Sequence, residues 1–246
     1  MTPGTSFNYG VVSPVACLNA GWAAIKDRYW LFVGITLVAT LLGGAVPIVL
    51  IGPMMCGLYM CLLGKMRGEP IEFGLLFKGF DYFVPGLVAA AIQTVPGFLI
   101  GLPMGFISAG LAIATSARER YPRTEGPPAI FWLVLAVLVI FAIILSLAIH
   151  ALFLFAYPLI VDRKLSGWEA IKTSYRAALK NLGGIVGLIL LNVGLGIVGF
   201  LCCFVGVYLV LPVTYAAYAA AYRQVFPETP MNFGSSPPPP PASWAA

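Results

Sequence analysis

Charged residues are scarce in this chain of 246 residues. They make up 9% of it, whereas about 25% is usual for a soluble globular domain. Histidine occurs once, and hydrophobic residues reach 60%. Because so few polar side chains cannot cover a folded surface in water, lipid is the expected solvent. The composition therefore predicts an all-α membrane protein.

Long basic runs are also missing, and no basic and aromatic residues alternate on one face. The net charge of +5 is therefore interpreted as a signal of membrane orientation, and no nucleic-acid partner is expected. The five cysteines are too few and too irregularly spaced for a disulfide framework, and they are expected to pack as small apolar residues. In an alternative interpretation, Cys56 meets Cys202 and Cys203 in a metal or redox site. The N-terminus does not have the pattern of a cleavable signal peptide.

Catalytic motifs are missing as well. The sequence contains no Ser-His-Asp arrangement, no H-E-x-x-H and no paired carboxylates, so we predict no enzyme, no cofactor and no metal. The pattern GLGIVG at 194–199 lies within an apolar run, without the strand and acidic residue of a dinucleotide site. Its glycines, like Gly183 and Gly187, are expected to let helices approach closely.

Apolar runs occupy residues 30–64, 82–117, 129–161 and 182–222, and one membrane span needs about 20 residues. The first run is predicted to be a hairpin of residues 31–51 and 54–66, with the second helix short unless it begins before Pro53. The last run is predicted to be a hairpin that turns around residues 203–206. The other two runs are one span each, separated by the polar segment 116–128. We therefore predict six transmembrane helices as three hairpins.

The placement of basic residues predicts the orientation. Eleven of the 14 Lys and Arg residues lie in segments on the side of the N-terminus, and Arg118, Arg120 and Arg123 lie in the segment 116–128. This distribution favours cytoplasmic termini. In the alternative, residues 82–117 form two short crossings broken at Pro96 and Pro103.

One phrase, Gly-Trp-x-Ala-Ile-Lys-x-x-Tyr, occurs twice, as GWAAIKDRYW at 21–30 and as GWEAIKTSYR at 167–176. Ser13-Pro14 predicts a helix start before the first copy, and the Ser166-x-x-Glu169 spacing predicts a capping box at the second. Each copy is expected to form a cytoplasmic amphipathic helix in the headgroup layer before a hairpin, with its larger apolar residues on one face: Val15, Leu18, Trp22, Ile25 and Tyr29; Trp168, Ile171, Tyr175 and Leu182. Residues 69–83, which include Lys78, follow the same plan before the middle hairpin.

These segments carry the predicted contacts with membrane lipids. Aromatic rings suit the water boundary, and basic side chains reach anionic headgroups. The phrase is attributed either to an internal duplication or to the suitability of Trp, Ile, Lys and Tyr for that depth. The predicted membrane-surface anchors are Trp22, Lys26, Tyr29, Trp168, Lys172, Tyr175, Arg176 and Lys180.

A second candidate site consists of the polar residues at membrane depth, which are Gln93, Thr94, His150 and Asn192. Gln93 and Thr94 precede a stretch rich in proline and glycine, and transporters use broken spans to hold solutes. In the alternative, the span is a kinked helix satisfied by its neighbours, and His150 is a hydrogen-bonded packing residue. An intramembrane enzyme would have only Asp162 with Tyr175 or His150 as its catalytic pair.

The chain divides into a helical membrane domain at 1–223 and a proline-rich cytoplasmic tail at 224–246. Five consecutive prolines at 237–241 predict a polyproline II rod without a core, so the tail is expected to be disordered. The tail is either a spacer or a ligand for an aromatic-lined groove of a partner protein.

Residues 7–226 carry a resemblance to a broad group of bacterial multi-pass membrane proteins, mostly uncharacterised. Some members are similar to the membrane domain attached to glycerophosphodiester phosphodiesterases. The most specific elements are Gly52-Pro53 with Gly57, Arg67-Gly68-Glu69, Phe77-x-Gly79-Phe80, and Asp162 with Glu169-Ala170 and Ser174. The resemblance implies a bacterial inner-membrane location and no established activity. The predicted role is to organise lipids or partner membrane proteins, possible partners including a second copy of the chain, and the alternative is a transporter or channel for a small or lipidic solute.

Overall fold

The computed structural model describes residues 7–120, 129–201 and 205–227, and within them every regular element is a helix. The predicted all-α class is confirmed for these residues. In chain order the elements are α1 (Pro14–Ile25), η1 (Lys26–Arg28), α2 (Tyr29–Ala45), α3 (Ile51–Met66), η2 (Phe73–Tyr82), α4 (Phe83–Arg120), α5 (Ala129–Leu152), α6 (Ala156–Arg163), α7 (Gly167–Lys180), α8 (Leu182–Leu201) and α9 (Val205–Val225). The predicted tail lies outside the described residues from 228 onward.

Several helical stretches have the length and hydropathy of membrane spans. Among the described residues there are four such stretches, Pro14–Ala45, Phe73–Thr94, Phe131–Arg163 and Leu182–Leu201. The helix α3 is also apolar but has only 16 residues. The protein is therefore a membrane protein by the character of its helices, while the length criterion supports fewer crossings than the six predicted.

The turn between α2 and α3 differs from the prediction. The helix α2 ends at Ala45, six residues before the expected end at 51, because Pro47 disfavours a helical conformation at Val46. Val46 is outside the helical region, with φ of −129° and ψ of 85°. The helix α3 begins at Ile51, so Pro53 lies in its first turn, where backbone N–H groups have no helical partner.

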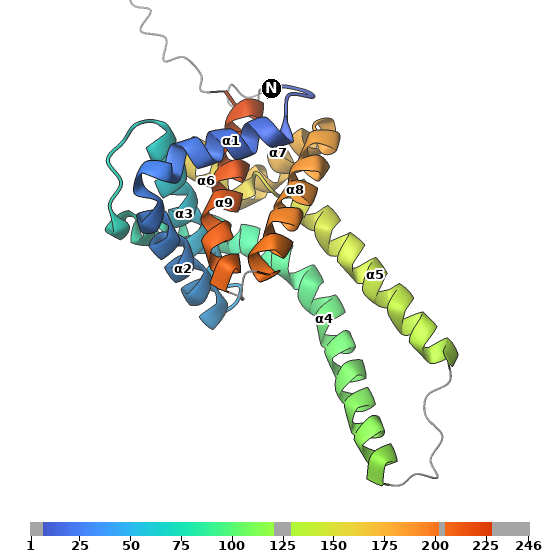
Figure 1. Ribbon diagram of the computed structural model, residues 1–246. Helices are drawn as coiled ribbons and strands as arrows, with labels where there is room; N and C mark the ends of the chain where they lie inside the picture. The colour runs from blue at the N-terminus through green and yellow to red at the C-terminus, as the bar shows by residue number, and fades with distance from the viewer. Residues whose placement is uncertain (1–6, 121–128, 202–204, 228–246) are drawn as a thin grey trace, which may run out of the picture.

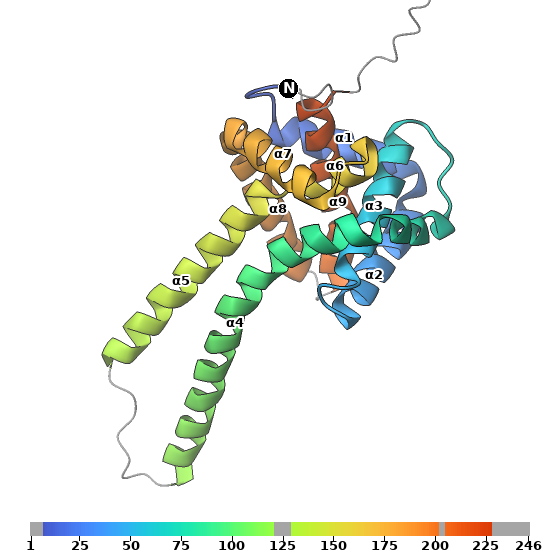
Figure 2. The ribbon, with the colours of Figure 1, turned by 180° about the vertical axis from the view of Figure 1, so that it is seen from behind.

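The helix α4 is continuous from Phe83 to Arg120, so the alternative of two short crossings broken at Pro96 and Pro103 is wrong for the backbone, whereas the alternative of a kinked helix agrees with it. The helix bends instead, as both ribbon views show (Figures 1 and 2). A proline removes one hydrogen bond and crowds the preceding turn, which bends a helix. In an apolar solvent a complete break would leave several backbone groups without partners, so bending costs less.

Consecutive long helices pack together as the pairs α2–α3, α4–α5 and α8–α9. The core centres on α3, where Leu58, Cys61 and Leu62 are at most 1% exposed. The α4–α5 pair projects from this body as a long arm (Figures 1 and 2). The helices α1, α6 and α7 lie at the opposite end, beside the C-terminal end of α9.

Each short element before a helix pair packs mainly on a different pair. The helix α1 lies on α9, η2 lies on α3, and α7 lies on α4. Each element therefore contacts the preceding pair, and α1 closes the series on the last pair. This arrangement joins the three units of the chain into one body.

Candidate functional site

The two copies of the repeated phrase have matching environments at their Gly-Trp positions. Gly21 and Gly167 are buried, whereas Trp22 and Trp168 are 46% and 56% exposed. A Cβ at Gly21 would stand 2.6 Å from the backbone nitrogen of Ala217 on α9, and a Cβ at Gly167 would stand 2.5 Å from the carbonyl oxygen of Pro85 on α4. The glycine in each copy therefore permits a helix crossing, a role that the sequence analysis did not assign.

The isoleucine and lysine of the phrase also match. Ile25 and Ile171 are at most 5% exposed, and both lysines lie on the exposed side of their helices. The tyrosines differ, because Tyr175 is 44% exposed, whereas the Tyr29 hydroxyl donates to the carbonyl of Leu209 on α9 at 2.6 Å. Tyr29 therefore ties α2 to α9 in addition to any contact with lipid.

The face predicted to carry the larger apolar residues of each helix is mostly not the face that packs on the body. Val15, Trp22, Trp168, Tyr175 and Leu182 are exposed, and the buried positions are mostly small: Cys17 and Gly21 on α1, and Gly167, Ala170, Thr173, Ser174, Ala177 and Ala178 on α7. Small residues allow close packing of helices, which leaves the large apolar residues on the outer side. The aromatic residues thus remain available for contact with lipid.

The helix α7 carries the basic part of this surface. The Ser166 hydroxyl accepts the backbone N–H of Glu169 at 3.4 Å and donates to its carboxylate at 3.0 Å. The N-cap of the predicted capping box is therefore confirmed, while the Glu169 carboxylate bonds to the Ser166 hydroxyl in place of the backbone N–H. Lys172, Arg176 and Lys180 are exposed, one turn apart. The Lys172 ammonium lies 5.1 Å from the centre of the Trp168 ring, a cation–π distance.

The structure brings together three of the four predicted polar residues of the second site. Gln93 and Thr94 on α4 and His150 on α5 line a cavity of about 530 Å³, with Ser146 beside them. We call this the α4–α5 cavity. Its remaining walls are apolar or glycine: Gly97, Gly101, Val139, Ala142, Ile143 and Ile149. Gln93 Nε2 is buried and lacks a hydrogen-bond partner among the described residues.

Asn192 on α8 lies outside the lining of this cavity. It is 6% exposed and lies near Tyr218 on α9, whose ring is 5.6 Å from the His150 ring. Tyr218 therefore connects the fourth predicted polar residue to the cavity. Among the described residues that line the cavity none is charged, so the site suits an uncharged group.

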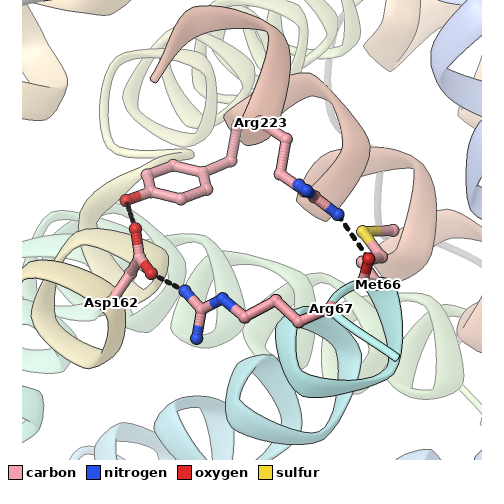
Figure 3. A network of polar contacts seen from close by, with 5 residues as sticks. Met66, Arg67, Asp162 and Arg223 are labelled. Carbon is pink, nitrogen blue, oxygen red and sulfur yellow. Dashed lines mark hydrogen bonds and ion pairs between the residues drawn. The ribbon is translucent and has the colours of Figure 1, made fainter. Parts of the chain in front are cut away.

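Asp162 takes part in a network of polar contacts that the sequence did not predict (Figure 3). The carboxylate accepts hydrogen bonds from Arg67, at the end of α3, and from the Tyr222 hydroxyl on α9, the latter at 2.6 Å. Arg223 donates to the carbonyl of Met66 at 2.6 Å. Asp162 is thus bound by neither His150 nor Tyr175, the partners considered for a catalytic pair. The signal in the sequence was the position of charged residues at the ends of apolar runs.

A second cavity lies beside this network and has a volume of about 660 Å³. Its charged residues are Asp27 on η1, Lys65 on α3 and Arg223 on α9, and Gln224 is also in its wall. The other walls are small or apolar: Ala20, Ala23, Ala24, Met66 and Ala220. We call this the α1–α9 cavity.

The glycine patterns of α8 have a partly different role from the one predicted. Gly183 contacts nothing within 4 Å of a Cβ position, whereas Gly184 lies against Val12 and Gly187 lies 2.9 Å from Pro14 by the same measure. In GLGIVG only Gly199 makes a close approach, to Gly206 on α9. The glycines of α8 with close neighbours from other segments are therefore Gly184, Gly187 and Gly199.

Cys17, Cys56 and Cys61 are buried free thiols. In the described part of the chain, no group of three His, Cys, Asp or Glu side chains is arranged to hold a metal ion. Cys202 and Cys203 lie outside the described residues, so the alternative pairing with Cys56 stays a prediction. Comparisons with protein-family models, curated proteins and solved structures found no match for this chain.

Proposed function

We propose that the chain is a six-span protein of a bacterial inner membrane that binds and organises lipids without catalysing a reaction. In this arrangement the pairs α2–α3, α4–α5 and α8–α9 are hairpins, and α1, η2 and α7 lie in the cytoplasmic headgroup layer. Both termini are then cytoplasmic. The proposal extends to partner membrane proteins, or a second copy of the chain, held at the same surface.

One observation carries this proposal. In both copies of the repeated phrase the tryptophan and the lysine are exposed, whereas the glycine is buried against a helix of the body. Aromatic and basic side chains on one outer surface are the pattern of an interfacial helix. The helices α1 and α7 lie at the same end of the molecule (Figures 1 and 2). Lys172, Arg176 and Lys180 add positive charge there.

Replacement of Lys172, Arg176 and Lys180 by glutamine tests this function. Each basic residue near an anionic surface contributes about 1 kcal/mol, so we expect the preference for anionic lipid to fall about a hundredfold. Glutamine retains the helix propensity of these positions. The measurement is the ratio of phosphatidylglycerol to phosphatidylcholine that the full-length protein retains from mixed vesicles, determined by mass spectrometry.

The matched control replaces Arg118, Arg120 and Arg123 by glutamine, because these arginines are predicted on the opposite side of the membrane. The control should retain the wild-type lipid ratio in vesicles that carry anionic lipid only in the leaflet facing α7. An equal ratio in the wild type and the α7 variant would overturn the proposed lipid-binding role.

The α4–α5 cavity favours a second candidate function, the passage or binding of an uncharged small or lipidic solute. Its support is the convergence of Gln93, Thr94 and His150 on one cavity, with a buried amide nitrogen that lacks a partner. A buried polar group without a partner destabilises a protein, and a solute that accepts its hydrogen bond offsets this cost.

Gln93→Ala tests this second function. We expect it to abolish the flux of glycerol or the flip of a fluorescent lipid in proteoliposomes, with protein abundance unchanged. Ser108→Ala is the control, because Ser108 lies on the same helix, bonds to Gly105 of its own helix, and is absent from the cavity wall. Equal flux in the wild type, Gln93→Ala and protein-free vesicles would exclude transport of these probes.

A further inference from the structure

The α1–α9 cavity contains two side chains of opposite charge, Asp27 and Lys65. Among the described residues, no ion pair is found between these two side chains. Oppositely charged groups that share a cavity without contact suit a ligand that carries both charges. Arg223 adds a second cation to the wall.

The positions of the charges are set by three helices. Lys65 lies in the last turn of α3, Asp27 follows α1, and Arg223 lies near the end of α9. The bond from Arg223 to the carbonyl of Met66 holds its guanidinium between α3 and α9 (Figure 3). The crossing of α1 over α9 at Gly21, together with four alanines in the wall, leaves the space between them.

The location of the cavity indicates where its ligand comes from. It lies among α1 and the C-terminal ends of α3 and α9, at the end of the molecule that also carries α7. The proposed function places this end in the headgroup layer, and the present inference rests on that placement. A headgroup is therefore the nearest source of a ligand with a phosphate.

We propose that the α1–α9 cavity binds a phosphoethanolamine group, with its phosphate at Lys65 and Arg223 and its primary ammonium at Asp27. The ammonium donates hydrogen bonds to the carboxylate, and the phosphate accepts from the two cations. A phosphocholine group lacks N–H donors for Asp27. A phosphoglycerol group lacks the positive charge, so both are poorer matches.

The test uses the full-length protein in a nonionic detergent. Dioleoyl phosphatidylethanolamine, phosphatidylcholine and phosphatidylglycerol are added in equal amounts, and the retained lipids are counted by native mass spectrometry. We expect phosphatidylethanolamine to be retained in preference to phosphatidylcholine, while phosphatidylglycerol also reports on α7. Asp27→Asn should reduce its preference over phosphatidylcholine at least about tenfold, since a hydrogen bond between charged groups is lost. Lys65→Gln should weaken retention of both lipids.

The matched control is Asp81→Asn with Lys78→Gln, because these residues are exposed on η2 and absent from the cavity wall. The control should retain the wild-type preference. Asp27 is itself exposed, so Asp27→Asn is expected to fold even if Lys65→Gln does not. Equal retention of phosphatidylethanolamine and phosphatidylcholine by the wild type, or an unchanged preference between them in Asp27→Asn, would overturn the proposal.

Two further experiments complete the test. The first distinguishes a lipid headgroup from a soluble ligand, and the second distinguishes this proposal from the proposed lipid-binding role of α7. Displacement of the lipid by soluble glycerophosphoethanolamine at similar concentration assigns the site to a soluble ligand, and failure to displace assigns it to the lipid. Both results support the same headgroup chemistry. The α7 triple variant should retain the phosphatidylethanolamine preference while losing the anionic one, so each proposal fails on a different readout.

Discussion

Asp162 is the residue that joins the ends of three helices. Its side chain is 17% exposed, and its carboxylate bonds to Arg67 from α3 and to Tyr222 from α9 while the residue itself belongs to α6. Arg163, its neighbour, lies 5.0 Å above the ring of the buried Phe226. These contacts hold the end of the molecule that borders the α1–α9 cavity.

Asp162→Asn should therefore destabilise the protein. The substitution removes the charge that Arg67 and Tyr222 contact, and we expect a loss of about 2 kcal/mol in the free energy of unfolding. Arg67 is 36% exposed, so solvent screening keeps the loss moderate. The measurement is unfolding in SDS followed by circular dichroism. Asp81→Asn, on the exposed side of η2, is the control, and equal stability of the two variants would contradict this role.

The helices α1 and α7 and the element η2 are attached to the body through glycines. Gly21 lies on α9, Gly167 on α4, and Gly79 on the backbone of Pro53 and Gly57 on α3. The middle unit, which begins with η2, does not contain the repeated sequence but shares this glycine crossing. If the phrase recurred only because its residues suit the headgroup layer, this would explain why Trp, Ile, Lys and Tyr occur in both copies. It would not explain why each of the three units crosses a neighbouring helix at a glycine. The shared crossing therefore favours an internal duplication.

Gly167→Val tests the crossing of α7 on α4. The new side chain would collide with the Pro85 carbonyl and with Val88, so we expect a loss of about 1–3 kcal/mol in the free energy of unfolding. Gly183→Val is the matched control, because Gly183 also lies in the first turn of a helix and has nothing within 4 Å of a Cβ position. The same SDS unfolding assay applies. A destabilisation of Gly183→Val equal to that of Gly167→Val would contradict the crossing.

The whole molecule combines helices of unequal length. The 16 residues of α3 extend about 24 Å, less than the roughly 30 Å of a hydrocarbon core, whereas the 38 residues of α4 extend about 57 Å. The α2–α3 pair is therefore the part of the molecule that tests the proposed six-span topology most directly. Gly44, near the end of α2, is exposed and contacts nothing within 4 Å of a Cβ position.

Cysteine labelling in whole cells measures this topology. In a background without the five native cysteines, Gly44→Cys and Glu125→Cys should react with a membrane-impermeant maleimide added outside. Lys172→Cys should react only after permeabilisation, because α7 is proposed to be cytoplasmic. Protection of Gly44→Cys in intact cells would reduce the number of spans, and labelling of Lys172→Cys there would reverse the orientation.

Local signals accounted for the helices and their starts. Ser13-Pro14 and Ser166 with Glu169 predicted helix starts that the structure confirms, because these signals depend on residues within one turn. The Ser166 side chain caps its helix, whereas Ser13 makes no side-chain cap hydrogen bond. Hydropathy located the apolar helices because it too depends only on residues that are close together in the sequence. The end of α2 at Ala45 was missed because a proline two positions beyond it decides the boundary, whereas the apolar run continues through it.

Composition and hydropathy alone determined that the protein is helical and apolar enough for a membrane, and the repeated phrase alone marked α1 and α7 as related. Only the tertiary structure decided which faces of these helices are buried. The sequence indicated that Trp168 and Ile171 share one face, but it did not indicate that the small Gly167 and Ala170 pack on the body, where backbones approach most closely without large side chains. Contacts between distant segments, such as Asp162 with Arg67 and Tyr222, depend on how helices cross, and no local pattern encodes that geometry.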